Sequence, residues 1–146
     1  MPRYFTLEEA RAALPVVGRS IREAVQAKAR YSEAEKVIQS LAQRILIMGG
    51  INVDTVAAEA WKAQYESNAE TLKTSMERIE EMGVIVKDLD IGLVDFPTLL
   101  RGEEVYLCWR MDEEDIDHWH GVNEGFAGRK PIDQHFVDNH RGEGRS

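Results

Sequence analysis

Side chains that can hold protons, metal ions or anions are concentrated between residues 84 and 130 of this 146-residue sequence. Carboxylate and imidazole groups carry out acid–base chemistry, and arginine guanidinium groups bind anions through paired hydrogen bonds. The sequence therefore places its strongest candidate ligand-binding site in this segment. The candidate residues are Asp95, Arg110, His120, Glu124 and Arg129.

Asp95 lies within the apolar segment IGLVDF, which is expected to form a strand. If this strand pairs with residues 104–110 through the loop PTLLRGE, facing residue numbers sum to about 200 and Asp95 shares a face with Leu107. A carboxylate among apolar side chains needs a partner, and Arg110 and Arg129 are the expected ones. An ion pair that pins the last loop to the sheet and a ligand site both remain open. A slip of one residue moves Asp95 to the other face.

Histidines and carboxylates in the same segment match the ligand types of divalent metal ions. His118 and His120 are separated by one residue, which aims both to one side of an extended segment. Asp88 and Asp90 are candidates to complete a set for zinc or a harder divalent ion. No HExxH motif or EF-hand loop is present, so packed, hydrogen-bonded surface histidines are the alternative interpretation.

The loop GFAGR at residues 125–129 can present backbone N–H groups and Arg129 to an anion. It lacks the phosphate-binding patterns GxGxxG and GxxxxGK[ST], and the alternative is that Gly125 and Gly128 serve turns with positive φ. Cys108, the only cysteine, lies in a predicted strand and is expected to be a buried, inert thiol rather than a nucleophile.

Two long helices are expected to come before this segment. Thr6 and Glu9 form a capping box in front of an apolar stripe, which predicts a helix over residues 7–48. Asp54 is the predicted N-cap of a second helix, and Gly83 is its predicted left-handed C-cap. The two helices are expected to pair as a long antiparallel hairpin of the coiled-coil type.

Residues 84–110 change to the patterning of a sheet. The segments VIVKD, IGLVDF and EVYLCWR are rich in β-branched and aromatic residues, which predicts three short antiparallel strands. Tyr4 and Phe5 are a candidate fourth strand at the edge, and the stretch after Arg110 is expected to form a helical turn or two and a loop. The predicted fold is α+β in a single domain, residues 1–146: a helical hairpin (6–83), a sheet and loop module (84–132) and a mobile polar tail (133–146).

Charge and composition limit the possible partners. The chain has 18 Lys and Arg against 26 Asp and Glu, so its net charge is −8, and hydrophobic residues make up 43%. A folded acidic chain lacks the basic surface that binds nucleic acid or anionic membranes. No stretch is apolar enough to span a membrane, and the first residues lack a secretory signal. A single cysteine fits a reducing compartment, so a cytoplasmic location is expected.

Two functional hypotheses remain open. The first is a non-enzymatic homodimer whose acidic sheet module binds a basic protein, since the apolar tip ILIMGGI exceeds what two helices can enclose. The alternative is an enzyme that binds a small anionic ligand or a divalent metal ion at the junction of sheet and loop.

Several motifs together resemble those of a small bacterial family known only as a domain of unknown function. They are YFTLEEA at the start, GLVDFP at 92–97, EVYLCWR at 104–110, Trp119-His120 and GFAGR at 125–129. The resemblance covers nearly the whole chain and implies the same order of long helices, short sheet and Gly-Arg loop. It implies no activity, cofactor or catalytic residue.

Overall fold

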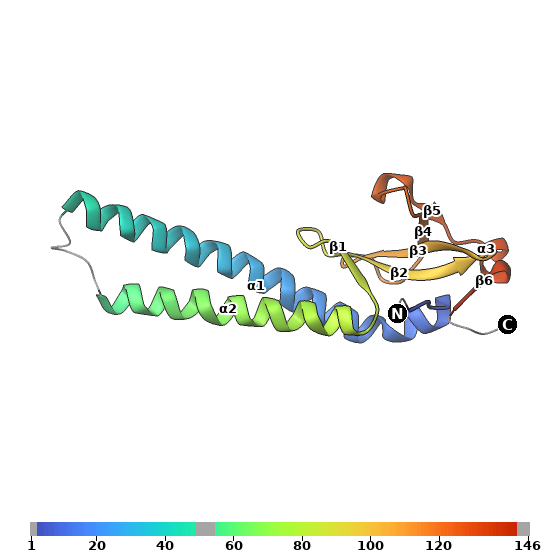
Figure 1. Ribbon diagram of the computed structural model, residues 1–146, viewed down its shortest axis with the longest axis horizontal. Coiled ribbons are helices and arrows are strands. Elements are labelled where there is room, and N and C mark those ends of the chain that lie inside the picture. Colours follow the sequence, from blue (N-terminus) through green and yellow to red (C-terminus); the bar gives the residue numbers. More distant parts are fainter. Residues whose placement is uncertain (1–2, 49–54, 143–146) are drawn as a thin grey trace. The chain divides into compact units, whose positions relative to one another are not determined.

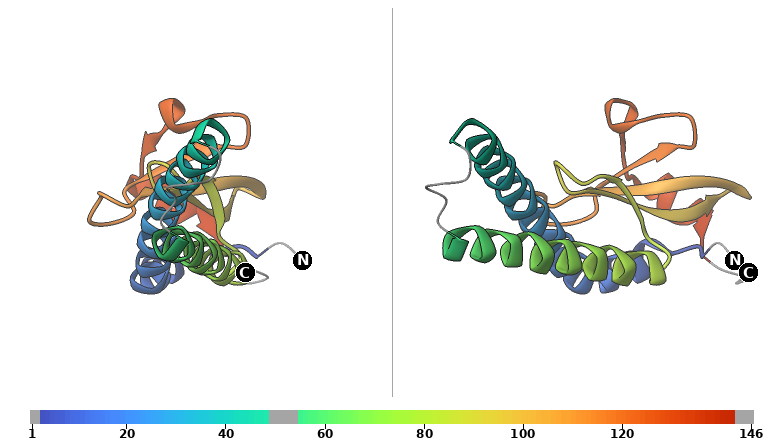
Figure 2. Two further views of the ribbon diagram at one scale, coloured as in Figure 1. Left: turned by 90° about the vertical axis from the view of Figure 1, so that its left-hand side faces the viewer. Right: turned by 60° about the vertical axis from the view of Figure 1, so that its left-hand side comes forward.

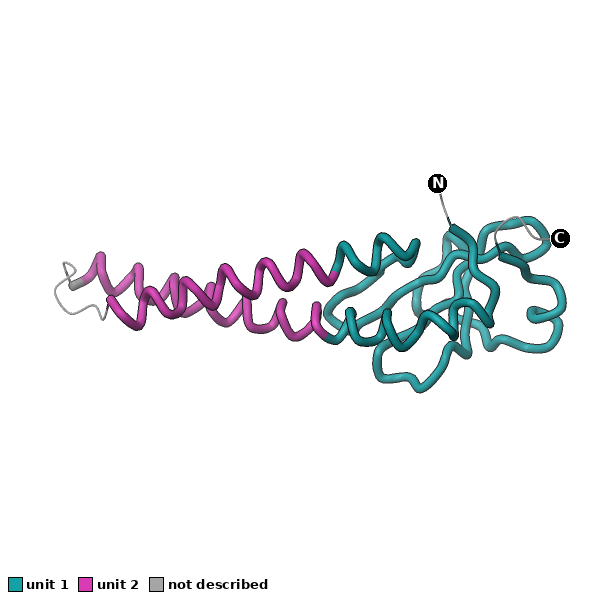
Figure 3. Tube along the Cα trace, turned by 90° about the horizontal axis from the view of Figure 1, so that it is seen from below, with its two compact units in different colours: residues 1–22, 76–146 teal, residues 23–75 magenta. Residues whose placement is uncertain are grey.

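The computed structural model describes residues 3–48 and 55–142. The chain forms two compact units, one of residues 1–22 and 76–146 and one of residues 23–75 (Figure 3). Among the described residues, no helix combines the length and apolar character that crossing a membrane requires.

Two long helices make up the first part of the chain, as the apolar periodicity predicts (Figure 1). α1 spans Leu7–Met48 and α2 spans Thr55–Glu81. The capping box before α1 is confirmed, because Thr6 N–H donates to Glu9 Oε1 over 2.9 Å and Glu9 N–H donates to Thr6 Oγ1 over 3.0 Å. These bonds satisfy backbone donors that have no partner inside the helix. Asp54, the predicted N-cap of α2, lies outside the described residues.

Gly83, the predicted C-cap, closes α2 in a Schellman motif. Its φ is 86°, its N–H donates to the Glu80 carbonyl over 2.9 Å, and Val84 N–H donates to the Ile79 carbonyl over 3.4 Å. Glycine suits the position because residues with a Cβ rarely adopt a positive φ. A Cβ here would also lie 2.8 Å from Arg3 Cβ. The predicted end of the helix is therefore confirmed.

Within the unit of residues 23–75, α1 and α2 run antiparallel (Figure 3). They contact each other through the aromatic side chains of Tyr31 and Tyr65. The rings of Tyr31 and Tyr65 stack with centroids 4.5 Å apart, and their hydroxyl oxygens are 2.8 Å apart. Ala27 and Ala34 of α1 are buried. The predicted helical hairpin is thus confirmed.

Six strands after the hairpin form one antiparallel sheet, which confirms the predicted α+β fold class (Figure 1). The strands are β1 Ile85–Asp88, β2 Leu93–Leu100, β3 Glu103–Arg110, β4 His118–Gly121, β5 Lys130–Pro131 and β6 His140–Arg141. They lie in the order β1-β2-β3-β4-β5, and β6 pairs with the far end of β2. The three strands predicted between residues 84 and 110 correspond to β1, β2 and β3.

The sheet has more strands than the three or four that the sequence predicts. Tyr4 and Phe5 are not a strand, although Phe5 N–H donates to the Pro97 carbonyl over 2.7 Å. β4 and β5 occupy the stretch expected to be turns and loop, while α3 (Gln134–Asn139) and β6 occupy the stretch expected to be a mobile tail. Such short strands carry too little alternation to be recognised, and they form because a neighbouring strand pairs with them.

A tight turn joins β2 to β3. Arg101 and Gly102 have φ values of 54° and 82°, and they connect Leu100 to Glu103, which pair with each other. Positive φ at both central residues is typical of the type I′ turn of a two-residue hairpin. The predicted seven-residue loop PTLLRGE is therefore wrong, because most of it belongs to the strands.

The turn also changes the register. Asp95 pairs with Cys108, three residues further along β3 than the predicted register gives. Because side chains alternate between faces along a strand, this odd shift places Asp95 on the opposite face from Leu107.

The sheet lies beside the first part of α1 (Figures 1 and 2). The face that carries Phe96 and Trp109 packs against this part of the helix, where a Cβ on Gly18 would lie 3.5 Å from the Trp109 ring. The ring of Phe5, which lies just before α1, meets the Phe96 ring edge to face with centroids 5.4 Å apart. The Arg22 guanidinium of α1 lies 6.0 Å from the Trp109 ring centroid. Apolar side chains of α1 and α2 complete this core, and those buried in this unit include Leu7, Ala10, Val17, Ile21 and Ile79.

The segment after β5 returns to the start of α1. His140 Nε2 accepts a hydrogen bond from Leu7 N–H over 2.9 Å, and the His140 ring stacks on Phe136 with centroids 5.1 Å apart. Phe136 is buried and also contacts the Trp119 ring at a centroid distance of 5.1 Å. Phe136 of α3 therefore belongs to the core of the unit, and His140 of β6 packs beside it.

Candidate metal centre

Three chemically active side chains meet on the face of the sheet that points away from α1. Asp95 of β2 pairs directly with Cys108 of β3, and His120 of β4 lies diagonally across from Cys108. Asp95 and Cys108 are 0% exposed and His120 is 2% exposed. One possible ligand atom from each lies within 4.8 Å of the other two. Two of the five candidate site residues, Asp95 and His120, are thus in contact.

The two ring nitrogens of His120 have different partners. Nδ1 is 2.8 Å from the Gly121 carbonyl oxygen, and Nε2 is 2.9 Å from Asp95 Oδ1. A carbonyl oxygen only accepts, so Nδ1 carries the hydrogen and donates it. This orientation aims Nε2 at Asp95. Histidines that bind metal ions characteristically donate their other N–H to such an acceptor.

Asp95 carries an oxygen atom without a partner. Its Oδ2 has no partner at hydrogen-bonding geometry among the described residues, although the side chain is fully buried. Burial raises the pKa of this carboxyl, and the contacts with His120 and with the Cys108 thiol beside it oppose the shift. The partner of Asp95 is therefore His120, where the sequence predicts Arg110 or Arg129. A buried oxygen that lacks a donor is costly and calls for an explanation.

Cys108 faces the same space as Asp95. Burial raises the pKa of its thiol to about 12, the Asp95 carboxylate adds to the shift, and Arg129 opposes it. At neutral pH the side chain is thus a neutral thiol and a poor nucleophile, as the sequence predicts. A bound metal ion reverses this, since coordination deprotonates a thiol outright.

Arg129 and His118 form a second cluster beside this one. Arg129 Nη2 lies 2.7 Å and 2.8 Å from the two carboxylate oxygens of Glu113, and 3.1 Å from His118 Nδ1. It also donates to the Cys108 carbonyl over 3.4 Å. The guanidinium group predicted to bind an anion is therefore engaged by a carboxylate of the same chain.

Arg110, the other predicted arginine, pairs with Asp112 at the edge of the sheet. The guanidinium groups of Arg110 and Arg129 lie 5.0 Å and 4.7 Å from the Phe126 ring centroid. Phe126 begins the short helical turn η1 (Phe126–Gly128) within the predicted GFAGR loop. Both arginines therefore fasten the loops after β3 and β4 and do not touch Asp95.

Glu124 stabilises the loop between β4 and β5, in which it lies. It accepts from Gly121 N–H over 2.8 Å and from Lys130 Nζ, and these two bonds lower the pKa of its carboxyl, Lys130 contributing most. A Cβ on Gly128 would lie 2.9 Å from Glu124 Cβ. Gly128 thus makes room for Glu124, and the positive φ predicted for Gly125 and Gly128 is wrong.

Of the candidate metal ligands, Asp88 ends β1 and Asp90 lies in the turn that follows, where Asp88 Oδ1 accepts from Asp90 N–H over 3.0 Å. His118 is in the arginine cluster described above. Among the described residues, Asp95, Cys108 and His120 are the group of three close enough to share an ion. The structure therefore brings together one of the four predicted metal ligands, His120, with two residues that the sequence analysis assigned other roles.

On its other side the Asp95, Cys108 and His120 cluster is bordered by a carboxylate and two tyrosines. The Tyr106 ring lies 5.4 Å from the His120 ring centroid, and its hydroxyl donates to Glu104 Oε2 over 2.7 Å. Tyr4 donates to the other oxygen of Glu104 over 2.9 Å. Glu104 raises the pKa of Tyr106 to about 12, so this hydroxyl stays protonated.

These features define an α+β protein whose sheet buries an Asp, Cys and His cluster on one face. The chain belongs to the family described as an uncharacterized conserved protein, DUF2203, whose sequence model matches residues 3–132. The resemblance drawn from the sequence motifs is thereby confirmed. Comparisons with curated proteins and with solved structures found no match.

Proposed function

We propose that this protein binds one divalent transition-metal ion through Asp95, Cys108 and His120. The observation that carries the proposal is Asp95 Oδ2, a fully buried carboxylate oxygen without a hydrogen-bond donor among the described residues. It lies in a cluster with an imidazole and a thiol, the two other side chains most often used as ligands. An ion would give this oxygen a positively charged partner at bonding distance.

The dimensions of the cluster fit such an ion. Zinc bonds to nitrogen, oxygen and sulfur are about 2.0–2.3 Å long, so ligand atoms around a tetrahedral ion lie roughly 3.3–3.8 Å apart. The three candidate atoms lie within 4.8 Å of one another, so side-chain rotations that draw them in by about an ångström complete the set. The fourth position is left for water or another small ligand.

The chemistry of the ligands selects the kind of ion. A thiolate and an imidazole favour borderline or soft ions such as zinc, whereas magnesium and calcium prefer oxygen ligands. The carboxylate and thiolate supply two negative charges, and a divalent ion cancels both. The buried cluster then has no net charge, which removes the main cost of placing ionised groups in a protein interior.

The surroundings favour this site over the predicted anion and basic-protein sites. Arg129 is held by Glu113 and cannot clamp an anion without giving up that pair. Several carboxylates of the acidic segment also have arginine partners within the chain: Asp112 pairs with Arg110, and Asp115 pairs with Arg11. Less unbalanced negative charge is left for a basic partner than the sequence alone indicates.

Metal analysis of the purified protein tests the proposal. After refolding with zinc, inductively coupled plasma mass spectrometry is expected to find about one ion per chain. Asp95→Ala, Cys108→Ala and His120→Ala are each expected to lose it, and cobalt bound to the unaltered protein is expected to show a thiolate charge-transfer band. His118→Ala is the matched control, because His118 lies outside the cluster and its variant should keep the ion.

Circular dichroism of each variant separates loss of the ion from loss of the fold. A folded protein that takes up no zinc or cobalt on refolding would overturn the proposal. Equal metal content in His118→Ala and His120→Ala would also contradict it.

We also propose a homodimer in the cytoplasm, formed by coiled-coil packing of the helical hairpins. The support is the apolar end of the hairpin, where Leu46 and Ile47 are 84% and 83% exposed. Large exposed apolar side chains close together are typical of association surfaces. A reducing cytoplasm would also keep Cys108 available as a ligand. Light scattering at tens of micromolar chain is expected to give twice the chain mass, and a monomer there would contradict the homodimer.

A further inference from the structure

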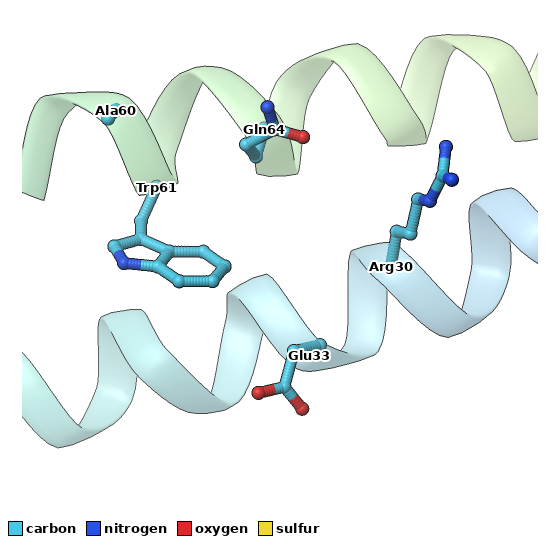
Figure 4. Close-up of a pocket in the computed structure, with 5 residues that line it drawn as sticks. All are labelled: Arg30, Glu33, Ala60, Trp61 and Gln64. Atoms are coloured by element: carbon cyan, nitrogen blue, oxygen red, sulfur yellow. The ribbon is translucent and has the colours of Figure 1, made fainter.

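A groove lies between α1 and α2 in the unit of residues 23–75 (Figure 4). The Trp61 ring reaches from α2 towards α1 at one end, and the Arg30 side chain reaches from α1 towards α2 at the other. The groove has a volume of about 480 Å³ and is lined by Arg30, Glu33, Ala60, Trp61 and Gln64. An aromatic ring in an open groove with charged groups at its rim is the composition of a protein contact surface.

The hairpin leaves apolar side chains uncovered beyond this groove. Every side chain of α1 from residue 42 to residue 47 is exposed, and Val56 near the start of α2 is 78% exposed. Two helices cover only the stripes that face each other, so these side chains stay in contact with water unless another surface covers them. The groove and the uncovered residues lie on the same two helices, which makes a partner helix pair the natural cover.

Arg30 and Glu33 give the groove a charge pattern that is complementary to itself. Neither forms an ion pair or hydrogen bond with another residue in the described part of the chain. They are three residues apart on α1 and are therefore neighbours on one face of the helix. When two copies of α1 lie antiparallel across a two-fold axis, Arg30 of each copy faces Glu33 of the other.

We infer that a second copy of this chain covers the groove, with the two hairpins antiparallel about a two-fold axis next to Arg30 and Glu33. The inference rests on the homodimer proposed above and names its contact. An interface between identical chains of this symmetry needs a patch that complements itself, and this pair of opposite charges meets that requirement. Trp61 is the anchor of the contact, since tryptophan and arginine side chains dominate interface free energies.

Charge reversal tests the contact directly. Arg30→Glu sets two carboxylates against each other at both symmetric positions, and Glu33→Arg does the same with two guanidinium groups. Each single variant of the full chain is expected to raise the dimer dissociation constant on the order of tenfold or more. The double variant Arg30→Glu/Glu33→Arg restores opposite charges and is expected to return to within about threefold of the original constant. Sedimentation velocity measures all of these constants.

Lys73→Glu is the matched control, because it makes the same charge change on an exposed residue of α2 outside the groove. It is expected to leave the dissociation constant within about twofold. Trp61→Ala is expected to weaken the dimer on the order of a hundredfold, while the exposed neighbour Lys62→Ala does not. Circular dichroism confirms that each variant keeps its helices.

Two negative outcomes have different meanings. An unaltered chain that is monomeric at all concentrations would overturn the homodimer, and with it this contact. A dimer that is insensitive to Trp61→Ala and to the single charge reversals would overturn the groove as the contact and leave the homodimer standing. Failure of the double variant to recover would contradict the pairing of Arg30 with Glu33.

Discussion

Both faces of β2 and β3 bury side chains near their centre, but different interactions stabilise the two faces. Phe96 and Leu107 are fully buried on one face, where removal of apolar surface from water contributes about 25 cal/mol for each Å². Asp95 and Cys108 are each one residue away along the same strands and are also fully buried. They lose hydration and gain little from packing. Burial alone therefore does not show what stabilises a position, and the polar face depends on what its groups bind.

A substitution on the apolar face should cause the largest loss of stability. Phe96→Ala removes the ring that meets Phe5, and it is expected to lower the free energy of unfolding by about 3–5 kcal/mol. Urea denaturation followed by circular dichroism measures this change. Val122→Ala, at a residue that is 52% exposed, is the control and should change stability by less than about 0.5 kcal/mol. A loss below about 1 kcal/mol for Phe96→Ala would contradict the packing described.

On the polar face, the loss of stability should depend on whether Asp95 is left buried without His120. In metal-free protein His120→Leu leaves Asp95 buried without its partner, and a loss of about 3 kcal/mol is expected. The double variant Asp95→Leu/His120→Leu removes both polar groups and should recover to within about 1 kcal/mol of the original stability. Both variants should fail to bind zinc. If the double variant is no more stable than the single one, the cost does not come from the unpartnered carboxylate.

Weakening the ion pair of Glu113 and Arg129, which lies beside the polar face, should cause the smallest loss of stability of the three. Glu113→Gln removes the charge that Arg129 contacts, but Arg129 keeps its contacts with Cys108 and His118. A loss of about 1–2 kcal/mol is expected, because one charge-assisted contact becomes a neutral one. Denaturation in parallel with Glu114→Gln, at an exposed neighbour, measures the difference. A loss as large as that of His120→Leu would contradict the smaller contribution expected of the Glu113 and Arg129 pair.

The sequence predicted the helices well because their end signals are local. The capping box of Thr6 and Glu9 and the C-cap at Gly83 both involve residues within a turn or so of each other. Such interactions depend little on the rest of the fold, so they can be recognised in a single sequence. The general order of hairpin and sheet follows from the same local patterns.

The register of β2 and β3 could not be predicted with the same ease. The turn at Arg101 and Gly102 places an arginine at positive φ, where asparagine, aspartate or glycine is the usual signal. The sequence PTLLRGE therefore resembles a long loop although its first four residues belong to β2. Because this one turn was predicted wrongly, the predicted register of every residue pair between β2 and β3 was wrong by three residues.

The site was predicted in part. Asp95 and His120 were both candidates, but their contact requires β4, a strand of four residues that pairs with β3 and β5. Cys108 was expected to be inert, and its place opposite Asp95 became evident only with the correct register. Residues that lie close only through the pairing of distant strands leave no periodic signal in the sequence.

The hydrogen bond between Leu7 and His140 has a consequence for how the chain is made. The acceptor of the Leu7 N–H lies 133 residues later. During synthesis α1 can wind as soon as its residues leave the ribosome, but its first turn keeps an unpaired backbone donor until residue 140 has been added. A chain that lacks the residues from Phe136 onward leaves this backbone donor unpaired and the apolar core open at the position of Phe136. A segment made 133 residues later therefore completes the first turn of α1.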